Sequence, residues 1–229
     1  MDYLFRIGNV IHHLKLQRSA NSKLGKGENI LTTYHFGVEQ LELDEKGTPK
    51  LSNDSTSCMD CPMSYNQGKP SCYTHNGLQR AGIIAKLKMI AKRGEIEEFD
   101  YTKFKEFVAK LSKKDIKMIR FGAYGEPVLL PIQVVSELSQ LARHTGYTHQ
   151  WNKPEYQLYS QYFMASTHNT FEVSIANDMG WRVFNVDILE GAVNCPASKE
   201  AGHKTVCSSC VLCNGAGGNS KKNIYILKH

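Results

Sequence analysis

Residues 117–138, KMIRFGAYGEPVLLPIQVVSEL, contain an apolar strand, a polar turn and a helix in direct succession. We predict the strand at residues 117–122 and the turn at Tyr124-Gly125-Glu126-Pro127. The helix is predicted to begin near Pro131 and to stop at Gly146, burying Val134, Val135, Leu138 and Leu141. A strand that leads into a helix over a short link is the repeating unit of parallel α/β folds.

The same alternation continues on both sides of this stretch. Helical periodicity predicts a helix over residues 76–93, which Gly94 ends, and a second helix with Asp100 as its N-cap. Further helices are expected at 155–161 and 170–178, and strands at 147–151, 163–166, 181–186, 192–194 and 223–227. Five or six such units favour an α/β fold with a partial parallel (βα) barrel, an incomplete TIM-type barrel, over a flat doubly wound sheet.

The length of 229 residues, 41% of them hydrophobic, suits one α/β domain. Within it we expect N-terminal strands and loops at 1–57, the barrel core at 58–194, and a C-terminal cysteine cluster with the last strand at 195–229. No run of about 18 apolar residues exists, which predicts no membrane span. The N-terminus does not resemble a signal peptide, so we expect a cytoplasmic chain whose cysteines form no structural disulfides.

Polar side chains gather where the predicted strands end. In parallel α/β folds the loops at the carboxyl ends of the strands share one face of the molecule. We therefore expect one polar site on that face and assign no catalytic role to any single member. The candidate cofactor-binding residues are Tyr124, Gly125, Glu126, His149 and Ser166.

The seven cysteines form two groups, Cys58-x2-Cys61-x10-Cys72 and Cys195-x11-Cys207-x2-Cys210-x2-Cys213. A spacing of two residues lets two thiolates face the same metal centre. Four cysteines can close a tetrahedral or a cubane site, whereas three leave one coordination position open. The sequence therefore predicts two metal sites.

The identity of the metal stays open between iron and zinc. A four-thiolate zinc site is one alternative, and His75 or His203 could complete a zinc site with the first three cysteines. The two successive two-residue spacings in the second group resemble ferredoxin-type ligation more than a zinc ribbon. We therefore favour iron–sulfur clusters and keep zinc as the alternative.

Three cysteines, two helices and a strand that ends in Ala123-Tyr124-Gly125-Glu126-Pro127 resemble the first half of a radical S-adenosylmethionine enzyme. The resemblance implies a [4Fe–4S] cluster on Cys58, Cys61 and Cys72, with a free iron that binds the methionyl group of S-adenosylmethionine. It also implies that Gly125 and Glu126 contact the amino group of that cofactor. The chain departs from the superfamily in its cysteine spacing and in Tyr124, which replaces the first glycine of a Gly-Gly-Glu-Pro segment.

The chain is also similar to phage-encoded proteins of the gene product 88 type. This similarity includes residues 21–25, 120–125, 144–151 and 195–200. It implies a phage origin, with the host cytoplasm as the location, and a three-cysteine barrel. It does not assign an activity.

Two functions therefore remain open. The first is an iron–sulfur enzyme of the radical S-adenosylmethionine-like type, with an unassigned substrate. The second is a zinc- or cluster-stabilised binding protein, without catalysis, that acts on nucleic acid or on a host defence protein complex. In that case His149, Gln150 and Trp151 would serve recognition, with Trp151 stacking on a base. The net charge of +6 is compatible with an acidic partner.

Overall fold

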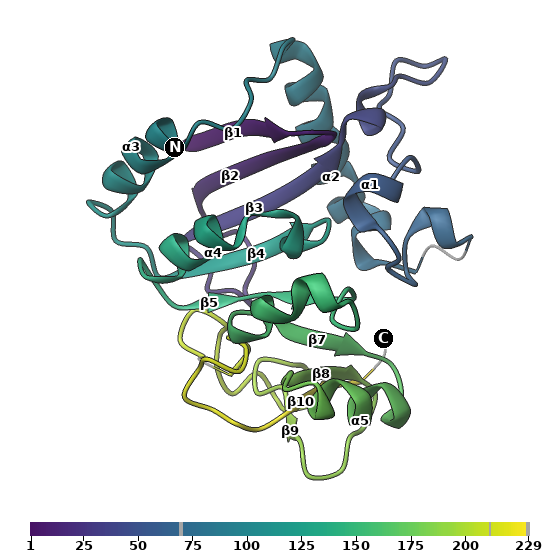
Figure 1. Cartoon of the computed structure of the whole chain (residues 1–229), viewed down its shortest axis with the longest axis vertical. Helices are drawn as coiled ribbons and strands as arrows, with labels where there is room; N and C mark the ends of the chain where they lie inside the picture. The colour runs from purple at the N-terminus through teal and green to yellow at the C-terminus, as the bar shows by residue number, and fades with distance from the viewer. Residues whose placement is uncertain (69–70, 211, 228–229) are drawn as a thin grey trace.

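The computed structural model describes residues 1–68, 71–210 and 212–227. Its strands form two five-stranded sheets, with the orders β1-β2-β3-β4-β5 and β6-β7-β8-β10-β9 (Figure 1). The strands of the first sheet are β1 (Asp2–Ile7), β2 (Val10–Arg18), β3 (Asn29–Gly37), β4 (Met118–Tyr124) and β5 (His144–Thr145). Those of the second are β6 (Tyr147–Thr148), β7 (Met164–Thr167), β8 (Val183–Val186), β9 (Val193–Asn194) and β10 (Ile224–Ile226).

Most strand pairs are parallel. The pairs β1/β2 and β2/β3 are antiparallel, whereas β3/β4, β4/β5 and every pair of the second sheet are parallel. Gly146 alone separates β5 from β6, and a Cβ atom there would lie 2.5 Å from the Phe163 ring. A mixed α/β fold with two sheets rich in parallel strands is therefore confirmed.

The helices follow the predicted alternation closely. Asp100 caps α3 by accepting hydrogen bonds from the backbone nitrogens of Thr102 and Lys103, as its position predicts. The α-helices are α1 (Ser55–Cys58), α2 (Gly77–Arg93), α3 (Tyr101–Leu111), α4 (Ile132–Ser139) and α5 (Thr170–Asp178). The 3-10 helices are η1 (Val38–Leu41), η2 (Tyr65–Gln67), η3 (Tyr73–His75), η4 (Pro127–Leu129) and η5 (Pro154–Gln161). Of the helices in the described part of the chain, none combines the length and apolarity that a membrane crossing requires.

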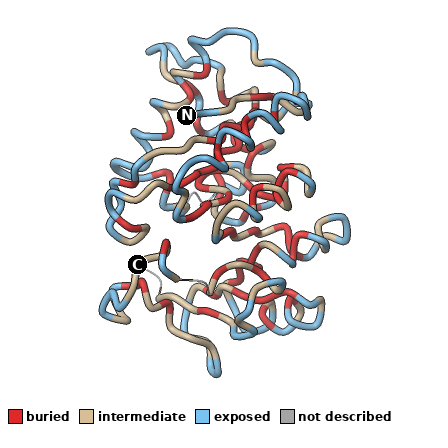
Figure 2. The backbone as a smooth tube through the Cα atoms, turned by 90° about the vertical axis from the view of Figure 1, so that its left-hand side faces the viewer, coloured by how far each residue is buried: buried red, intermediate tan, exposed pale blue. Residues whose placement is uncertain are grey.

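The first sheet is covered on both faces. Helices α3 and α4 pack against Leu14, Leu31 and Phe121 in the larger core cluster. Helix α2 packs on the other face, against Ile11 and Tyr34. Buried residues consequently follow the strands, while the outer loops are exposed (Figure 2).

Two predicted boundaries are wrong by three residues or more. Helix α4 ends at Ser139 and not at Gly146, because the Ile119 nitrogen donates to the Arg143 carbonyl and this pairing requires extended chain there. The strand predicted over 147–151 ends at Thr148, since the Gln150 nitrogen donates to the Thr148 hydroxyl and turns the chain away.

A neutral histidine pair lies in the core of the first sheet. His12 and His35 are fully buried, and their Nδ1 atoms are 3.0 Å apart. Burial lowers the pKa of His12 to about 3, and burial together with a charge on His12 lowers the pKa of His35 well below its ordinary value. Both histidines must therefore be neutral when the protein is folded at neutral pH.

We expect this pair to make the folded chain sensitive to acid. The unfolded chain binds protons first, near pH 6.5, so the stability from neutral histidines is complete above that pH and is lost as the pH falls toward 3. Between pH 6.5 and pH 5 the protonation of His12 in the unfolded chain should lower the unfolding free energy by about 2 kcal/mol, and His35 should act in the same direction. For the double variant His12→Phe/His35→Met, denaturant unfolding should show a smaller loss of unfolding free energy between pH 6.5 and pH 5 than the wild-type chain shows. An equal loss in the two proteins would contradict the neutral state of these histidines.

Candidate metal centres

The first cysteine group lies in a loop built around α1. Cys58 ends this helix, and Met59 follows with a φ of 50°, a left-handed conformation that non-glycine residues seldom adopt. The Cys61 nitrogen then donates to the Cys58 carbonyl, 3.0 Å away. The two-residue spacing therefore produces a tight turn that carries both thiols, as predicted.

Asp54 holds the rest of this loop in place. It is fully buried, and its carboxylate accepts hydrogen bonds from the backbone nitrogens of Tyr65 and Asn66, at 2.8 and 3.0 Å. His75 lies beside it, with Nε2 4.0 Å from Asp54 Oδ2, and its ring contacts Tyr65. Sequence reasoning missed Asp54, because nothing local distinguishes it from a surface acid.

Cys61, Glu126 and His149 meet beside this loop. Each offers a ligand atom, and these three atoms lie within 4.8 Å of one another. His149 Nε2 is buried and has no hydrogen-bond partner among the described residues, although the Cys61 thiol lies near the ring. A sulfur, an oxygen and a nitrogen donor therefore lie close enough together to coordinate one metal ion.

Glu126 links this group of three side chains to the end of β6. Its carboxylate accepts from the Thr148 hydroxyl at 2.6 Å and from the His149 backbone nitrogen at 3.2 Å, and it lies 3.3 Å from His149 Nδ1. Burial alone would lower the pKa of His149, but its contacts with Cys61 and Glu126 outweigh burial and raise it to about 10. A metal ion bound at His149 must therefore replace a proton.

Gly125 brings the Gly-Glu-Pro turn against the cysteine loop. Its φ is +74°, and a Cβ atom there would lie 2.4 Å from the His35 carbonyl oxygen and 3.0 Å from that of Ser57. The Glu126 nitrogen donates to the same Ser57 carbonyl, at 2.8 Å. Glycine is required here for both reasons, conformation and close approach.

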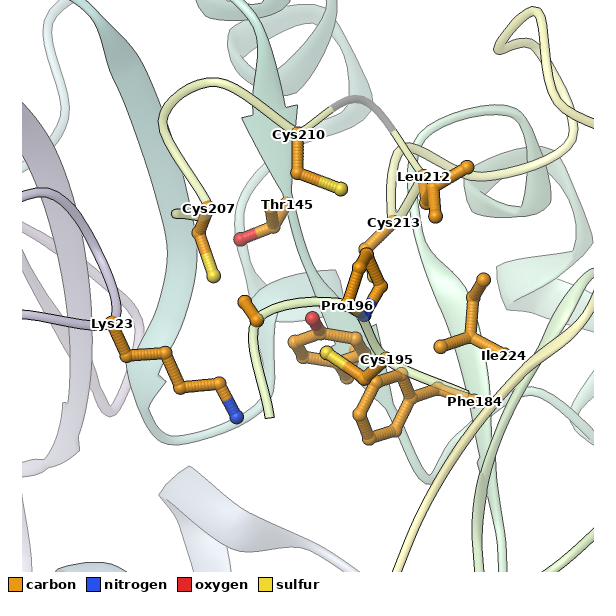
Figure 3. Close-up of a pocket in the computed structure, with 12 residues that line it drawn as sticks. Lys23, Thr145, Phe184, Cys195, Pro196, Cys207, Cys210, Leu212, Cys213 and Ile224 are labelled. Carbon is orange, nitrogen blue, oxygen red and sulfur yellow. The ribbon is translucent and has the colours of Figure 1, made fainter. Parts of the chain in front are cut away.

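The second cysteine group surrounds a small cavity of about 30 Å³ (Figure 3). This volume is larger than the cavity volume that one buried water molecule requires. Tyr147, Phe184 and Lys23 also line it. All four cysteines of the group contribute to the lining: Cys195, Cys207, Cys210 and Cys213.

Segments distant in the sequence support these four cysteines. The Cys195 nitrogen donates to the Tyr225 carbonyl in β10, and the Cys207 nitrogen donates to the Lys23 carbonyl in the β2–β3 loop. The Cys210 nitrogen donates back to the Cys207 carbonyl at 3.1 Å, which forms the second tight turn. The cavity therefore exists only in the folded chain.

Arg182 fixes the segment that follows Cys213. This arginine is buried, and its guanidinium donates to the carbonyls of Leu212, Gly215 and Lys222, with the Leu212 contact at 2.7 Å. One side chain thus ties three carbonyls of the C-terminal segment to the residue that precedes β8. Sequence reasoning missed it, since its partners lie 30 to 40 residues away.

Burial keeps four of the thiols protonated without a metal. It raises the pKa of Cys213 to about 12 and the pKa of Cys207, Cys58 and Cys72 above the ordinary thiol value. A neutral thiol is a poor nucleophile, whereas a coordinated one loses its proton. The environment therefore suits metal ligands better than catalytic thiols.

The remaining predicted residues are placed differently. Tyr124 is buried, and its hydroxyl accepts from Gln40 at 2.7 Å, so it supports the cysteine loop from behind. Ser166 is buried on β7, where its carbonyl accepts from the Trp151 indole. Trp151 is only 6% exposed, so its prediction as a stacking surface is wrong: the indole is part of the main core. Among the histidines, His149 and neither His75 nor His203 joins the group at Cys61.

No protein-family model, curated protein or solved structure matches this chain. The comparisons therefore assign no family, and the function rests on the geometry of the two cysteine sites.

Proposed function

We propose that the chain is an iron–sulfur protein with two clusters, one in each cysteine group. The observation that carries the proposal is the cavity ringed by Cys195, Cys207, Cys210 and Cys213. Cys207 and Cys210 share one turn and the other two come from elsewhere in the chain, yet all four cysteines line one cavity (Figure 3). Four thiolates around a cavity suit the Cys₄ ligation of a [4Fe–4S] cluster.

The spacing of the thiols favours a cluster over a single ion. Tetrahedral zinc with Zn–S bonds of about 2.3 Å would bring its sulfurs within about 3.8 Å of one another. In the described part of the chain, no three of the seven thiols lie within 4.8 Å of one another. The cysteines of a cubane stand farther apart, because each binds a different iron.

The charges around the second site also suit thiolate ligands. Burial raises the pKa of Cys207, whereas the charges of Lys23 and Arg120 oppose that rise. A cluster held by four thiolates carries net negative charge, which these two cations would offset.

For the first group we propose an open cluster on Cys58, Cys61 and Cys72, with S-adenosylmethionine as its ligand. The position of the Gly-Glu-Pro turn supports this, since Glu126 has an oxygen within 4.8 Å of a donor atom of Cys61. Thr148 and His149 together direct three donor groups at the Glu126 carboxylate. A carboxylate has about four lone-pair sites, so about one remains to accept a hydrogen bond from an ammonium group. When bound, such a cluster supplies one electron to its ligand. A partial (βα) barrel belongs to the same proposal, supported by the run of parallel strands from β3 onward.

Metal analysis of anaerobically prepared protein tests the clusters. We expect brown protein with broad absorption near 400 nm and roughly eight iron per chain, as two cubanes require. Cys195→Ser/Cys213→Ser and Cys61→Ala should each remove about half of the iron. Ser208→Ala, next to Cys207 but without a ligand atom, should keep all of it. Colourless protein with one or two zinc ions per chain would overturn the proposal.

A second function is favoured by one observation. Cys61, Glu126 and His149 form a mixed sulfur, oxygen and nitrogen set, which zinc binds readily. In that case the first site is structural, and the chain is a zinc- or cluster-stabilised binding protein that acts on nucleic acid or a host protein without catalysis.

Titration with S-adenosylmethionine decides between the two functions. With an open cluster, calorimetry on fully loaded protein should show binding, and a reductant should yield 5′-deoxyadenosine. Cys61→Ala should abolish both, while Cys195→Ser/Cys213→Ser should retain the binding heat. No heat on protein with full iron occupancy would favour the binding protein.

A further inference from the structure

A row of polar and basic residues crosses the first sheet. Lys15 of β2 pairs with Thr32 of β3, which pairs with Arg120 of β4, which pairs with Thr145 of β5. Residues paired across neighbouring strands share a face of the sheet. These side chains therefore point to one side, together with Tyr34, which follows Thr32 by two residues on β3. Thr32, Tyr34 and Thr145 are buried there, whereas Lys15 and Arg120 are half-buried.

Aromatic rings hold two cations on this face. Lys86 extends from α2, with its Nζ 4.5 Å from the centre of the Tyr34 ring. The Arg120 guanidinium carbon lies 5.9 Å from the centre of the Tyr73 ring, and its Nη2 donates to the Tyr73 hydroxyl at 2.5 Å. Together with Lys15, three cations from β2, β4 and α2 gather beside tyrosines.

These cations lack acidic partners. Within the described ranges, no carboxylate oxygen lies within 4.0 Å of Lys15, Lys86 or Arg120. The acid in the same row, Asp2, is engaged by Arg93 at 3.0 Å and by His13 at 3.3 Å. All three cations are half-buried, and burial together with the charge of Lys15 lowers the pKa of Lys86. Half-buried like charges are unfavourable unless an anion approaches them.

Arg120 has a second role at the C-terminal cysteine site. Its charge and that of Lys23 act on Cys207, so both help to balance thiolates there. Lys15 and Lys86 are thus the charges that most need an external anion.

We propose that the half-buried cations Lys15, Lys86 and Arg120, beside α2, bind the phosphate backbone of a single-stranded nucleic acid. Lys15 and Arg120 stand two strands apart, roughly 10 Å, so one phosphate group does not reach both. Tyr73 is 53% exposed beside Arg120 and offers a ring on which a base can stack. A basic track with an exposed aromatic ring is the usual pattern for single-strand binding. The inference does not depend on which metal the cysteines bind.

Fluorescence anisotropy with a labelled single-stranded DNA of about 12 nucleotides tests the site on metal-loaded protein. Lys15→Gln/Lys86→Gln should weaken binding at least tenfold at about 50 mM salt and reduce the slope of log affinity against log salt by roughly 1.4, as the loss of two phosphate contacts predicts. The control is Lys110→Gln/Lys113→Gln. It removes the same charge from exposed positions in and just after α3, which packs on the opposite face, and should leave both values unchanged.

Three results would overturn the proposal. They are no binding at about 50 mM salt, equal weakening in both double variants, or competition by pyrophosphate that equals competition by unlabelled DNA at the same phosphate concentration. A further variant guards against misfolding of the lysine pair. Tyr73→Leu, at an exposed position, should weaken binding at least about fivefold through lost stacking, and unchanged binding would contradict the role of that ring.

Discussion

Arg182→Met should lower the apparent midpoint of thermal unfolding by about 10 °C and release the metal of the C-terminal site. The substitution leaves the carbonyls of Leu212, Gly215 and Lys222 without their buried donor, at a cost of about 3 to 4 kcal/mol. The cysteine segment then loses its attachment to β8. Circular dichroism under anaerobic, reducing conditions measures the midpoint, and iron analysis should show a loss of about half.

Two comparisons make the Arg182 result specific. Arg182→Lys keeps the charge but not the planar fork, so it should recover only part of the lost stability. Arg93→Met breaks an exposed ion pair with Asp2 and should change the unfolding free energy by less than about 1 kcal/mol. If Arg182→Met unfolds at the wild-type temperature, the anchoring role is wrong.

Gly125→Ala should destabilise the chain by about 3 to 5 kcal/mol, a fall of roughly 10–15 °C in the midpoint. The left-handed backbone contributes about 1 to 2 kcal/mol. The remainder comes from the new methyl group, which would lie 2.4 Å from the His35 carbonyl oxygen in β3. Because backbone on both sides must shift, the turn that carries Glu126 should move away from Cys61, and metal content at the first site should fall as well.

Gly191→Ala provides the matched control. Gly191 has a φ of +73°, almost equal to that of Gly125, but a Cβ atom there would meet nothing within 4 Å. Only the conformational cost applies, so its midpoint should fall by a few degrees. Equal effects of the two substitutions would show that the close approach at Gly125 contributes nothing.

Local patterns in the sequence predicted much of the framework. Helices α2 and α3 follow from apolar periodicity and from end signals such as Asp100, because helix formation and capping involve neighbours within four residues. The tight turns at Cys58–Cys61 and Cys207–Cys210 follow for the same reason. Errors arose where distant chain intervened, as at the end of α4, where pairing with β4 overrode the helical pattern.

The amino-acid sequence by itself determined the succession of helices and strands and the presence of two cysteine groups, since both depend on contacts between near neighbours. Only the tertiary structure decided which residues complete each site. His149 meets Cys61 across 88 positions, and Cys207 rests on Lys23 across 184. Trp151 lies in the core and not at the surface, and its indole nitrogen donates to the Ser166 carbonyl. Such contacts depend on how β-strands pair and how loops close over them, and no local spacing encodes either.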